Sequence, residues 1–302
     1  MLAKLSIAAR KQDPEDVDQW DDISVHEAFE REGFSKGLAG RLLRPFFEGV
    51  LLDPDLGTDA SLFRSYFSLF SRGRGFVPRG GMASIPRKMA EDLPRGSLRC
   101  AAGIREILRR GDQAAGVILE DGEIIEASKL ILATELSTST QLLGRPSPPM
   151  GRETTSLYFS SAKPLYSDKL IVLPGGRHPL VRLYVQLSNV NPEVAPLGQH
   201  LLSASLVGPT AGSRSVEALF EEALEEISIH EPGAAEILEP LHGFRVRNAL
   251  PAQTPTFRKW HRDAFSALPG GMILAGDHTT QGSIQGAILS GERAAIRAMT
   301  GR

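Results

Sequence analysis

A stretch near the carboxyl end of the sequence combines residues that could hold an electron-rich ligand. A run of apolar residues ending at Ala275 is typical of a buried strand, and Gly276 and Asp277 follow it. Ligands approach the carboxyl edge of such a sheet, where a carboxylate can accept a hydrogen bond from a ribose or ribityl hydroxyl. Gly282 permits a sharp turn. A helix predicted to begin near Ser283 would then direct free amides and a positive dipole end at the ligand.

The other residues that could do chemistry show no catalytic or metal-binding spacing. The seven histidines are scattered, without an H-E-x-x-H pattern, and no Ser-His-Asp arrangement follows from spacing. His278 directly follows Asp277, so an acid–base role is one hypothesis and a satisfied polar residue is the other. The single cysteine, Cys100, excludes an intrachain disulfide and a cysteine-based metal cage. We therefore predict no metal site and leave the catalytic residues unassigned.

Several helices must position these residues. Ser24 and Glu27 have the spacing of a capping box, which predicts a short helix that ends near Gly33. A second helix is expected from near Ser35 to the residue before Pro45, because proline disfavours helix in the residue it follows. Ser215 and Ser283 are expected to begin two long helices towards the carboxyl end.

Two further helices carry apolar stripes. The segment 59–71 has aromatic and aliphatic residues at helical spacing, which form either a buried core stripe or an aromatic wall over a large apolar ligand: Leu62, Phe63, Tyr66, Phe67, Leu69 and Phe70. Ser84 is expected to cap the next helix, with Pro86 in its first turn. Its inner face would comprise Met82, Ile85, Met89 and Leu93.

Strand signals fall into two groups. The first lies at 98–100, 104–108, 116–120 and 123–127, with Asp121-Gly122 as a hairpin turn. The apolar run 129–133 is expected to be a strand buried on both faces. The second group is antiparallel, at 157–161, 170–173, 181–187 and 201–207, with a further strand at 241–250.

Length and composition limit the class of protein. The 302 residues allow about two domains. The formal net charge of −2 gives no electrostatic case for nucleic acid, and no apolar run is long enough to span a membrane. The amino terminus does not look like a signal peptide, and the acidic stretch from Asp13 to Asp22 is most simply a solvated loop. We expect a cytoplasmic protein, with peripheral membrane contact if its substrate is a lipid.

Three segments together resemble the superfamily of flavin-dependent amine oxidases, phytoene desaturases and protoporphyrinogen oxidases. They are RPFFEGVLLD to PRKMAEDL at 44–93, GIREI to KLILAT at 103–134, and ALPGGMILAGDHTTQGSIQGAILSGERAA at 267–295. Their order and spacing match the later two thirds of the family. The third segment is the most specific, and the first indicates the desaturase-like branch.

The resemblance implies the fold class and domain organisation. We expect an α/β plus α+β protein, in which the remnant of an FAD-binding Rossmann-like domain is joined to a mixed-sheet substrate domain. Residues 1–85 and 146–245 would form the substrate domain. Residues 86–145 and 246–302 would form the FAD-binding domain.

The resemblance also implies which residues bind FAD. Gly276 and Asp277 would approach the ribityl–pyrophosphate region, and Ser283, Ile284 and Gln285 would lie at the flavin edge, mostly through their backbone. In the second segment, Ile104 would contact the adenine side, and Ala133 and Thr134 would form the small-residue strand end near the dinucleotide. For Ile104, an ordinary strand core position is an equal alternative.

One part of the family pattern is missing from the sequence. The family begins with a strand, a G-x-G-x-x-G turn and a helix that hold the pyrophosphate, and these 302 residues contain no such motif. The chain is therefore expected to be a fragment, one half of a split enzyme, or a descendant that has lost flavin binding. A partner chain or self-association could complete the FAD site. We expect poor solubility or self-association, because 130–133 and 273–275 lose neighbouring strands.

The predicted activity is that of an FAD-dependent oxidoreductase that removes hydride from a large apolar small-molecule substrate. Amine-oxidising members usually have an aromatic residue where this sequence has Ser283, so a simple amine oxidase is disfavoured but stays an alternative, as does a flavin-dependent isomerase. A non-catalytic binding or scaffold protein is the alternative from another class.

Overall fold

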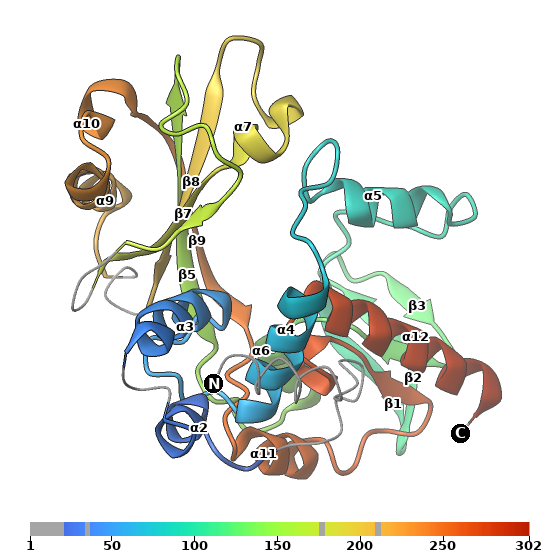
Figure 1. Cartoon of the computed structure of the whole chain (residues 1–302). Helices are drawn as coiled ribbons and strands as arrows, with labels where there is room; N and C mark the ends of the chain where they lie inside the picture. The colour runs from blue at the N-terminus through green and yellow to red at the C-terminus, as the bar shows by residue number, and fades with distance from the viewer. Residues whose placement is uncertain (1–20, 34–36, 175–178, 209–212, 302) are drawn as a thin grey trace. The chain divides into compact units, whose positions relative to one another are not determined.

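The computed structural model describes residues 21–33, 37–174, 179–208 and 213–301 (Figure 1). The predicted start of a helix near Ser35 and the acidic loop before residue 21 lie outside the described residues. The chain divides into two compact units. Unit 1 contains Ile23–Leu93 and Arg152–Ala249, and unit 2 contains Pro94–Gly151 and Leu250–Arg302. The result is a mixed α/β fold with three sheets.

Unit 1 is built on a five-stranded sheet with the strand order β6-β7-β8-β5-β9. Its strands are β5 (Arg152–Ser161), β6 (Ile171–Val172), β7 (Val181–Gln186), β8 (His200–Val207) and β9 (Glu239–Leu250). The pairs β6–β7, β7–β8 and β5–β8 are antiparallel, as predicted. Short helices α7 (Leu187–Val190) and η1 (Pro192–Val194) connect β7 to β8.

Helix α9 (Val216–His230) covers one face of this sheet, together with α10 (Ala234–Ile237) (Figure 1). The oxygen of Ser215 caps α9 by accepting a hydrogen bond from the amide of Ala218, as its sequence predicted. Alternate residues of β5, such as Leu157 and Phe159, point at the helix and are fully buried. The sheet and α9 therefore enclose the largest described apolar core.

A second core of unit 1 lies among its first helices, α2 (Val25–Arg31), α3 (Leu38–Val50) and α4 (Ala60–Arg72). Both hydrogen bonds of the predicted capping box between Ser24 and Glu27 are present. In α4, the predicted core stripe is confirmed for Leu62, Phe63 and Tyr66, which are buried, whereas the end of the stripe at Phe70 is 52% exposed.

Two predictions for this region are wrong. Helix α3 does not end before Pro45 but continues through it. The proline removes one helical hydrogen bond, but the helix still buries Leu43 and Phe47. Ser84 does not cap the next helix, α5 (Ser84–Glu91), because it is the first helical residue and donates to the carbonyl of Gly81. No residue of α5 is buried, so its apolar stripe does not face a core.

Unit 2 contains a three-stranded antiparallel sheet, β1 (Ile104–Arg110), β2 (Gln113–Leu119) and β3 (Ile124–Glu126). The predicted hairpin turn is confirmed: Gly122 has a positive φ of 91°, and the amide of Leu119 donates to Glu123 at 2.9 Å. The predicted strand at 98–100 is absent, because no hydrogen-bonded partner strand faces it in the described residues.

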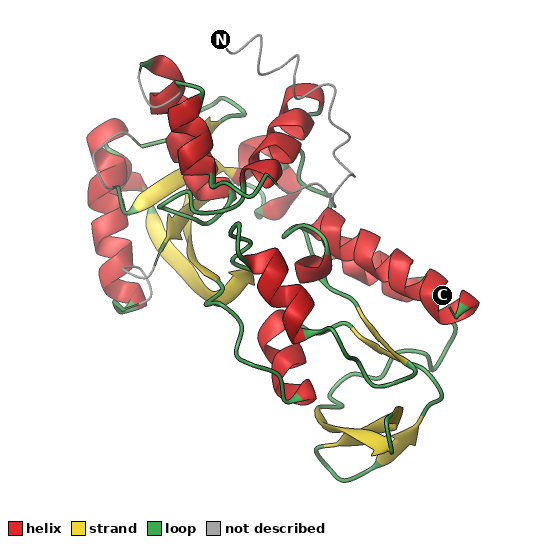
Figure 2. Ribbon diagram, turned by 90° about the horizontal axis from the view of Figure 1, so that it is seen from below, coloured by secondary structure: helices red, strands yellow, loops and turns green. Residues whose placement is uncertain are grey.

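The second sheet of unit 2 is a parallel pair, β4 (Leu130–Leu132) and β10 (Met272–Leu274). Its helices are α6 (Leu136–Leu143), α11 (Phe257–Ala264), η2 (Asp277–Thr279) and α12 (Ile284–Thr300), and Figure 2 shows α12 beside the strand pair. The prediction that 129–133 is buried on both faces is wrong, because Ile131 is 41% exposed. In the described residues β4 is hydrogen-bonded to β10 alone, so no described strand pairs with its second edge. No described helix is long and apolar enough to span a membrane.

Candidate flavin-binding site

The strand end at 275–277 has the geometry that its sequence predicted. The amide of Ala275 donates to the carbonyl of Leu132 at 2.9 Å and so extends the parallel pair by one residue. Gly276 then leaves the sheet with φ of 135°, and its amide donates to Ser290 Oγ on α12 at 2.9 Å. A Cβ on Gly276 would lie 2.7 Å from His278 Nε2. Only glycine fits this turn, because both its φ and its surroundings exclude a side chain.

The beginning of α12 presents backbone donors at its surface. Ser283 is the N-cap, and its oxygen accepts a hydrogen bond from the amide of Gly286 at 2.9 Å. In the described residues, no group accepts from the amides of Ile284 or Gln285, and both residues are exposed. Free first-turn amides and the helix dipole together favour an electron-rich group. This helix end can therefore hold the electron-rich edge of a ring or an anion.

The first turn of α12 is held tightly against the preceding loop. A Cβ on Gly286 would lie 1.9 Å from the carbonyl oxygen of Gln281, so only glycine allows the loop to pass. Thr280 Oγ1 also donates to the carbonyl of Gly286 at 2.8 Å. These contacts fix the direction in which the free amides point.

Sequence analysis missed the residue that supports this loop from behind. Gln253 is buried; its side-chain nitrogen donates to the carbonyl of Thr280 at 2.9 Å, and its oxygen accepts from the amide of Gly282 at 2.8 Å. The side-chain amide of Gln253 pairs with two backbone groups of the loop, as a neighbouring strand would. A single glutamine gives no periodic signal, and Gln253 lies far from the turn in sequence. Only the folded chain brings it to the site.

Asp277 follows the strand end as a half-buried carboxyl group. Burial raises its pKa from the ordinary value, and backbone hydrogen bonds at Asp277 and His278 oppose part of that shift. No described cation lies within ion-pair distance of it. A ligand hydroxyl could donate to this carboxyl group in addition to the two backbone amides.

His278 lies behind the turn rather than in front of it. Its side chain is only 3% exposed, and its Nδ1 lies 3.0 Å from Nε2 of His261 on α11. Burial lowers the pKa of each imidazole to about 4, so the pair is neutral at pH 7. One ring donates and the other accepts. This environment favours a positioning role for His278 over the acid–base hypothesis.

The remaining predicted cofactor residues lie in two places. Ala133 and Thr134 follow β4, and the carbonyl oxygen of Thr134 lies 3.6 Å from the place that a Cβ on Gly276 would take. The structure therefore brings the two strand ends together. Ile104 is not part of this cluster, because it begins β1 of the separate three-stranded sheet and is 38% exposed. The roles of all these residues in flavin binding stay predictions.

Unit 1 carries an exposed aromatic cluster that sequence analysis did not single out. Tyr158 on β5 and Phe244 on β9 make an edge contact with ring centroids 5.9 Å apart, and His242 lies 4.4 Å from Phe244. The alternation of 242, 244 and 246 along β9 could have indicated it. Gly243 points the other way, towards Leu157 and Phe220 in the core. The aromatic cluster therefore lies on the sheet face opposite α9.

No group of three or more His, Cys, Asp or Glu residues that could hold a metal ion occurs in the part of the chain that the structure describes.

Comparison with known proteins identifies the family. The sequence matches the model of the flavin containing amine oxidoreductases over residues 2–299, so the chain belongs to this family. A search of curated proteins gives no match. Members of the family contain a flavin.

Solved structures show the same fold at low sequence identity. An oxidoreductase from Methanosarcina mazei is 16% identical with a TM-score of 0.66, over 98% of this chain and 71% of that chain. Putrescine oxidase bound to putrescine is 17% identical with a TM-score of 0.71, over 98% and 73%. Reduced UDP-galactopyranose mutase is 14% identical with a TM-score of 0.69, over 93% and 69%.

Proposed function

We propose that this chain forms part of an FAD-dependent oxidoreductase that removes hydride from a large apolar substrate. The observation that carries the proposal is the turn from Ala275 to Gly286, where a strand end, two free amides and a half-buried carboxyl group meet. Membership of the flavin-containing family supports the same conclusion. When bound, the flavin would accept the hydride and later pass its electrons to another acceptor.

The residues of the chain would orient and polarise that cofactor. The amides of Ile284 and Gln285 would donate to the ring edge that becomes electron-rich on reduction, which favours the reduced state. Asp277 would accept a hydrogen bond from a ribityl or ribose hydroxyl. Gly276 allows the chain to turn sharply beside the ligand, because a Cβ there would collide with the imidazole of His278.

The exposed aromatic cluster of unit 1 supports an apolar substrate. Aromatic rings on an open sheet face lose unfavourable contact with water when an apolar ligand covers them. The hydroxyl of Tyr158 and the imidazole of His242 add polar atoms at its edge, which could orient the ligand. Phe70, exposed at the end of α4, is a further apolar group of the same unit.

We further propose that another stretch of polypeptide completes the cofactor site, because the 302 residues contain no G-x-G-x-x-G turn. A two-stranded parallel sheet is marginal alone and normally needs neighbours on its open edge. The free edge of β4 and the exposed apolar residues of α12, Ile284, Ile288 and Met299, would receive a strand and a helix. The added segment could belong to a longer form of this chain, to a partner or to a second copy.

A spectrum of the FAD-treated chain tests the proposal. The 302-residue protein is incubated with FAD and desalted, and its visible absorption is recorded. Retained flavin would show that these residues hold it, alone or in an oligomer. A colourless protein would show that the additional segment is indispensable, and the experiment would be repeated with the segment supplied.

Asp277→Ala sharpens the test of the contact. In the flavin-binding form, we expect about tenfold weaker FAD retention, the size of one lost hydrogen bond to a charged group. Asp112→Ala, an exposed carboxylate in a turn of the same unit, is the matched control and should retain FAD normally. Equal retention by both variants would contradict the assigned contact.

The specific observation that favours a second candidate, a non-catalytic binding protein, is the missing pyrophosphate turn. Such a protein would keep the aromatic cluster and its ligand while failing to bind FAD with any added segment. Binding of an apolar probe to a chain that never retains flavin would support it.

A further inference from the structure

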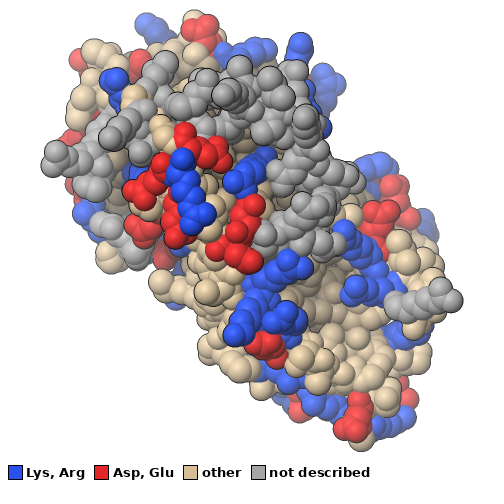
Figure 3. Space-filling model, turned by 60° about the horizontal axis from the view of Figure 1, so that its bottom comes forward, with Lys and Arg blue, Asp and Glu red and all other residues tan. Residues whose placement is uncertain are grey.

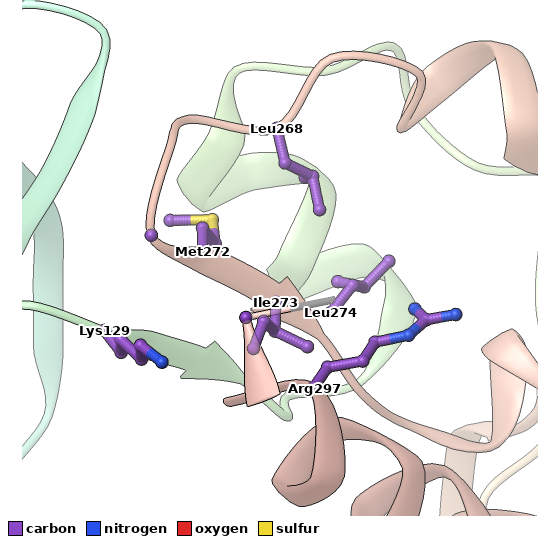
Figure 4. Close-up of a pocket in the computed structure, with 8 residues that line it drawn as sticks. Lys129, Leu268, Met272, Ile273, Leu274 and Arg297 are labelled. Atoms are coloured by element: carbon purple, nitrogen blue, oxygen red, sulfur yellow. The ribbon is translucent and has the colours of Figure 1, made fainter. Parts of the chain in front are cut away.

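A groove runs between α11 and α12 in unit 2. It consists of two adjoining cavities of about 360 and 600 Å³, which share Leu268, Leu274 and Arg297. Figure 4 shows the larger cavity, in which Leu274 and Arg297 lie side by side and Lys129 stands at the opposite end. Cavities of this size accommodate small organic ligands. We call the two together the basic groove.

The charge of the basic groove is of one sign. Arg262 on α11, Arg293 and Arg297 on α12 and Lys129 before β4 line it, and no Asp or Glu does. Figure 3 shows Lys and Arg side chains gathered on both sides of a hollow that is otherwise neutral. Converging cations around a concave surface raise the local concentration of anions.

This arrangement costs stability unless an anion is bound. Arg293 and Arg297 lie one helical turn apart, and like charges at that spacing repel each other. In the described residues neither forms an ion pair, and Arg262 has only its neighbour Asp263, 3.6 Å away. Surface arginines in the rest of unit 2, such as Arg99 and Arg110, are paired with glutamates instead.

The remaining lining residues indicate the rest of the ligand. The hydroxyls of Ser266 and Thr279 lie in the smaller cavity with the arginines. Each hydroxyl already donates its proton to a backbone carbonyl, so the arginines are the groups that can donate to anionic oxygens there. The larger cavity is floored by Leu268, Met272, Ile273 and Leu274. A ligand that fills both cavities must therefore be anionic at one end and apolar at the other.

We propose that the basic groove binds a small phosphate monoester or diphosphate ester with an apolar organic group. Planar guanidinium groups bind phosphate oxygens bidentately, and three of them match the several oxygens of such a group better than a single carboxylate. The apolar group lies along Leu268 and Leu274. This inference does not depend on flavin binding by the turn at 275–286.

The smaller cavity of the basic groove lies directly behind the candidate flavin turn, because Thr279, Thr280 and Ser290 line it, whereas the larger cavity lies farther along α12. Arg297 follows Ser283 by 14 residues on one helix, so at about 1.5 Å per residue the two lie roughly 21 Å apart along its axis. Lys129 precedes β4, whereas the flavin residues follow it. The larger cavity therefore lies towards the opposite end of the parallel strand pair from the candidate flavin residues.

Titration calorimetry of the full 302-residue chain tests the proposal with two probes, inorganic pyrophosphate and hexyl phosphate. Both should bind, and Arg297→Gln and Arg293→Gln should each weaken both about tenfold, the effect of one lost charge-assisted hydrogen bond. Leu268→Asn should weaken hexyl phosphate and leave pyrophosphate unchanged. Arg109→Gln, exposed on β1 outside the groove, is the matched control and should change neither.

Several results would overturn the proposal. They are no binding of either probe at millimolar concentration, equal binding by the groove variants and the Arg109 control, and binding to phosphatidic acid vesicles without binding of hexyl phosphate. Near-ultraviolet circular dichroism identifies a variant that does not fold. Because Arg293 and Arg297 are substituted separately, one folded variant suffices to decide.

Discussion

The two units differ in how much of their stability they supply themselves. In the described residues, the main core of unit 1 has thirteen buried apolar residues, whereas that of unit 2 has five. Unit 1 encloses its core between a five-stranded sheet and α9, but unit 2 has a two-stranded parallel sheet with an open edge. The candidate cofactor residues belong to the unit with the smaller core. The largest apolar core and the candidate cofactor residues therefore lie in different units.

The largest expected effect comes from the core of unit 1. Phe159→Ala should lower the free energy of unfolding by about 3–5 kcal/mol, because the ring is fully buried against Phe220. All four tyrosines belong to unit 1, whereas Trp260 belongs to unit 2. Urea unfolding is followed by tyrosine near-ultraviolet circular dichroism and by Trp260 fluorescence in a Trp20→Phe background.

The matched control for this change is Phe76→Ala, which removes the same atoms from a side chain that is 80% exposed. It should alter stability by less than about 0.5 kcal/mol. If Phe159→Ala shifted the tryptophan signal as much as the tyrosine signal, the two units would unfold together and the contrast between them would fail.

A prediction about pH concerns unit 2. Burial lowers the pKa of His261 and His278 to about 4, whereas an unfolded histidine has a pKa near 6.5. The unfolded state therefore binds more protons, so the stabilisation is complete above about pH 6.5 and is lost as the pH falls towards 4. The loss should reach at least about 3 kcal/mol, from 1.36 kcal/mol per pKa unit.

Stability against urea at pH 7, 5.5 and 4.5, followed by Trp260 fluorescence, measures this loss. His261→Gln should roughly halve the slope, because only one buried imidazole remains. His26→Gln, at an exposed histidine of α2 in unit 1, should leave the slope unchanged. A slope that is equal in all three proteins would show that the buried pair does not control the acid sensitivity.

The sequence alone predicted the features that depend only on residues adjacent in the chain. The capping box at Ser24, the hairpin at Gly122 and the N-cap at Ser283 all formed as expected, because each depends on a few adjacent side chains and backbone groups. Helix α3 continued through Pro45 because tertiary burial outweighed a local preference. A rule that considers only adjacent residues does not include the free energy gained when distant residues form a core.

What escaped prediction depends on segments far apart in the chain. Gln253 supports a loop almost thirty residues away, and Arg262 faces Arg293 across a groove between two helices. Neither has a sequence period or a motif. The exposed inner side of α5 was not expected either, because its helical stripe has the pattern of an ordinary core face.

The smallest expected effect comes from comparing two glycines of α12, Gly286 in the tight turn of the candidate site and Gly291 farther along the helix. Gly286→Ala should cost about 1–3 kcal/mol, because its Cβ would lie 1.9 Å from the carbonyl oxygen of Gln281 and force the loop to move. Gly291→Ala, on the same helix with nothing within 4 Å, should instead stabilise the protein by up to about 1 kcal/mol. Because the same methyl group is added in both variants, helix propensity cancels.

In the flavin-binding form, only Gly286→Ala should also weaken FAD retention, since it displaces the amides of Ile284 and Gln285. Equal retention and equal melting temperatures in the two variants would show that the tight turn neither limits stability nor positions the helix end.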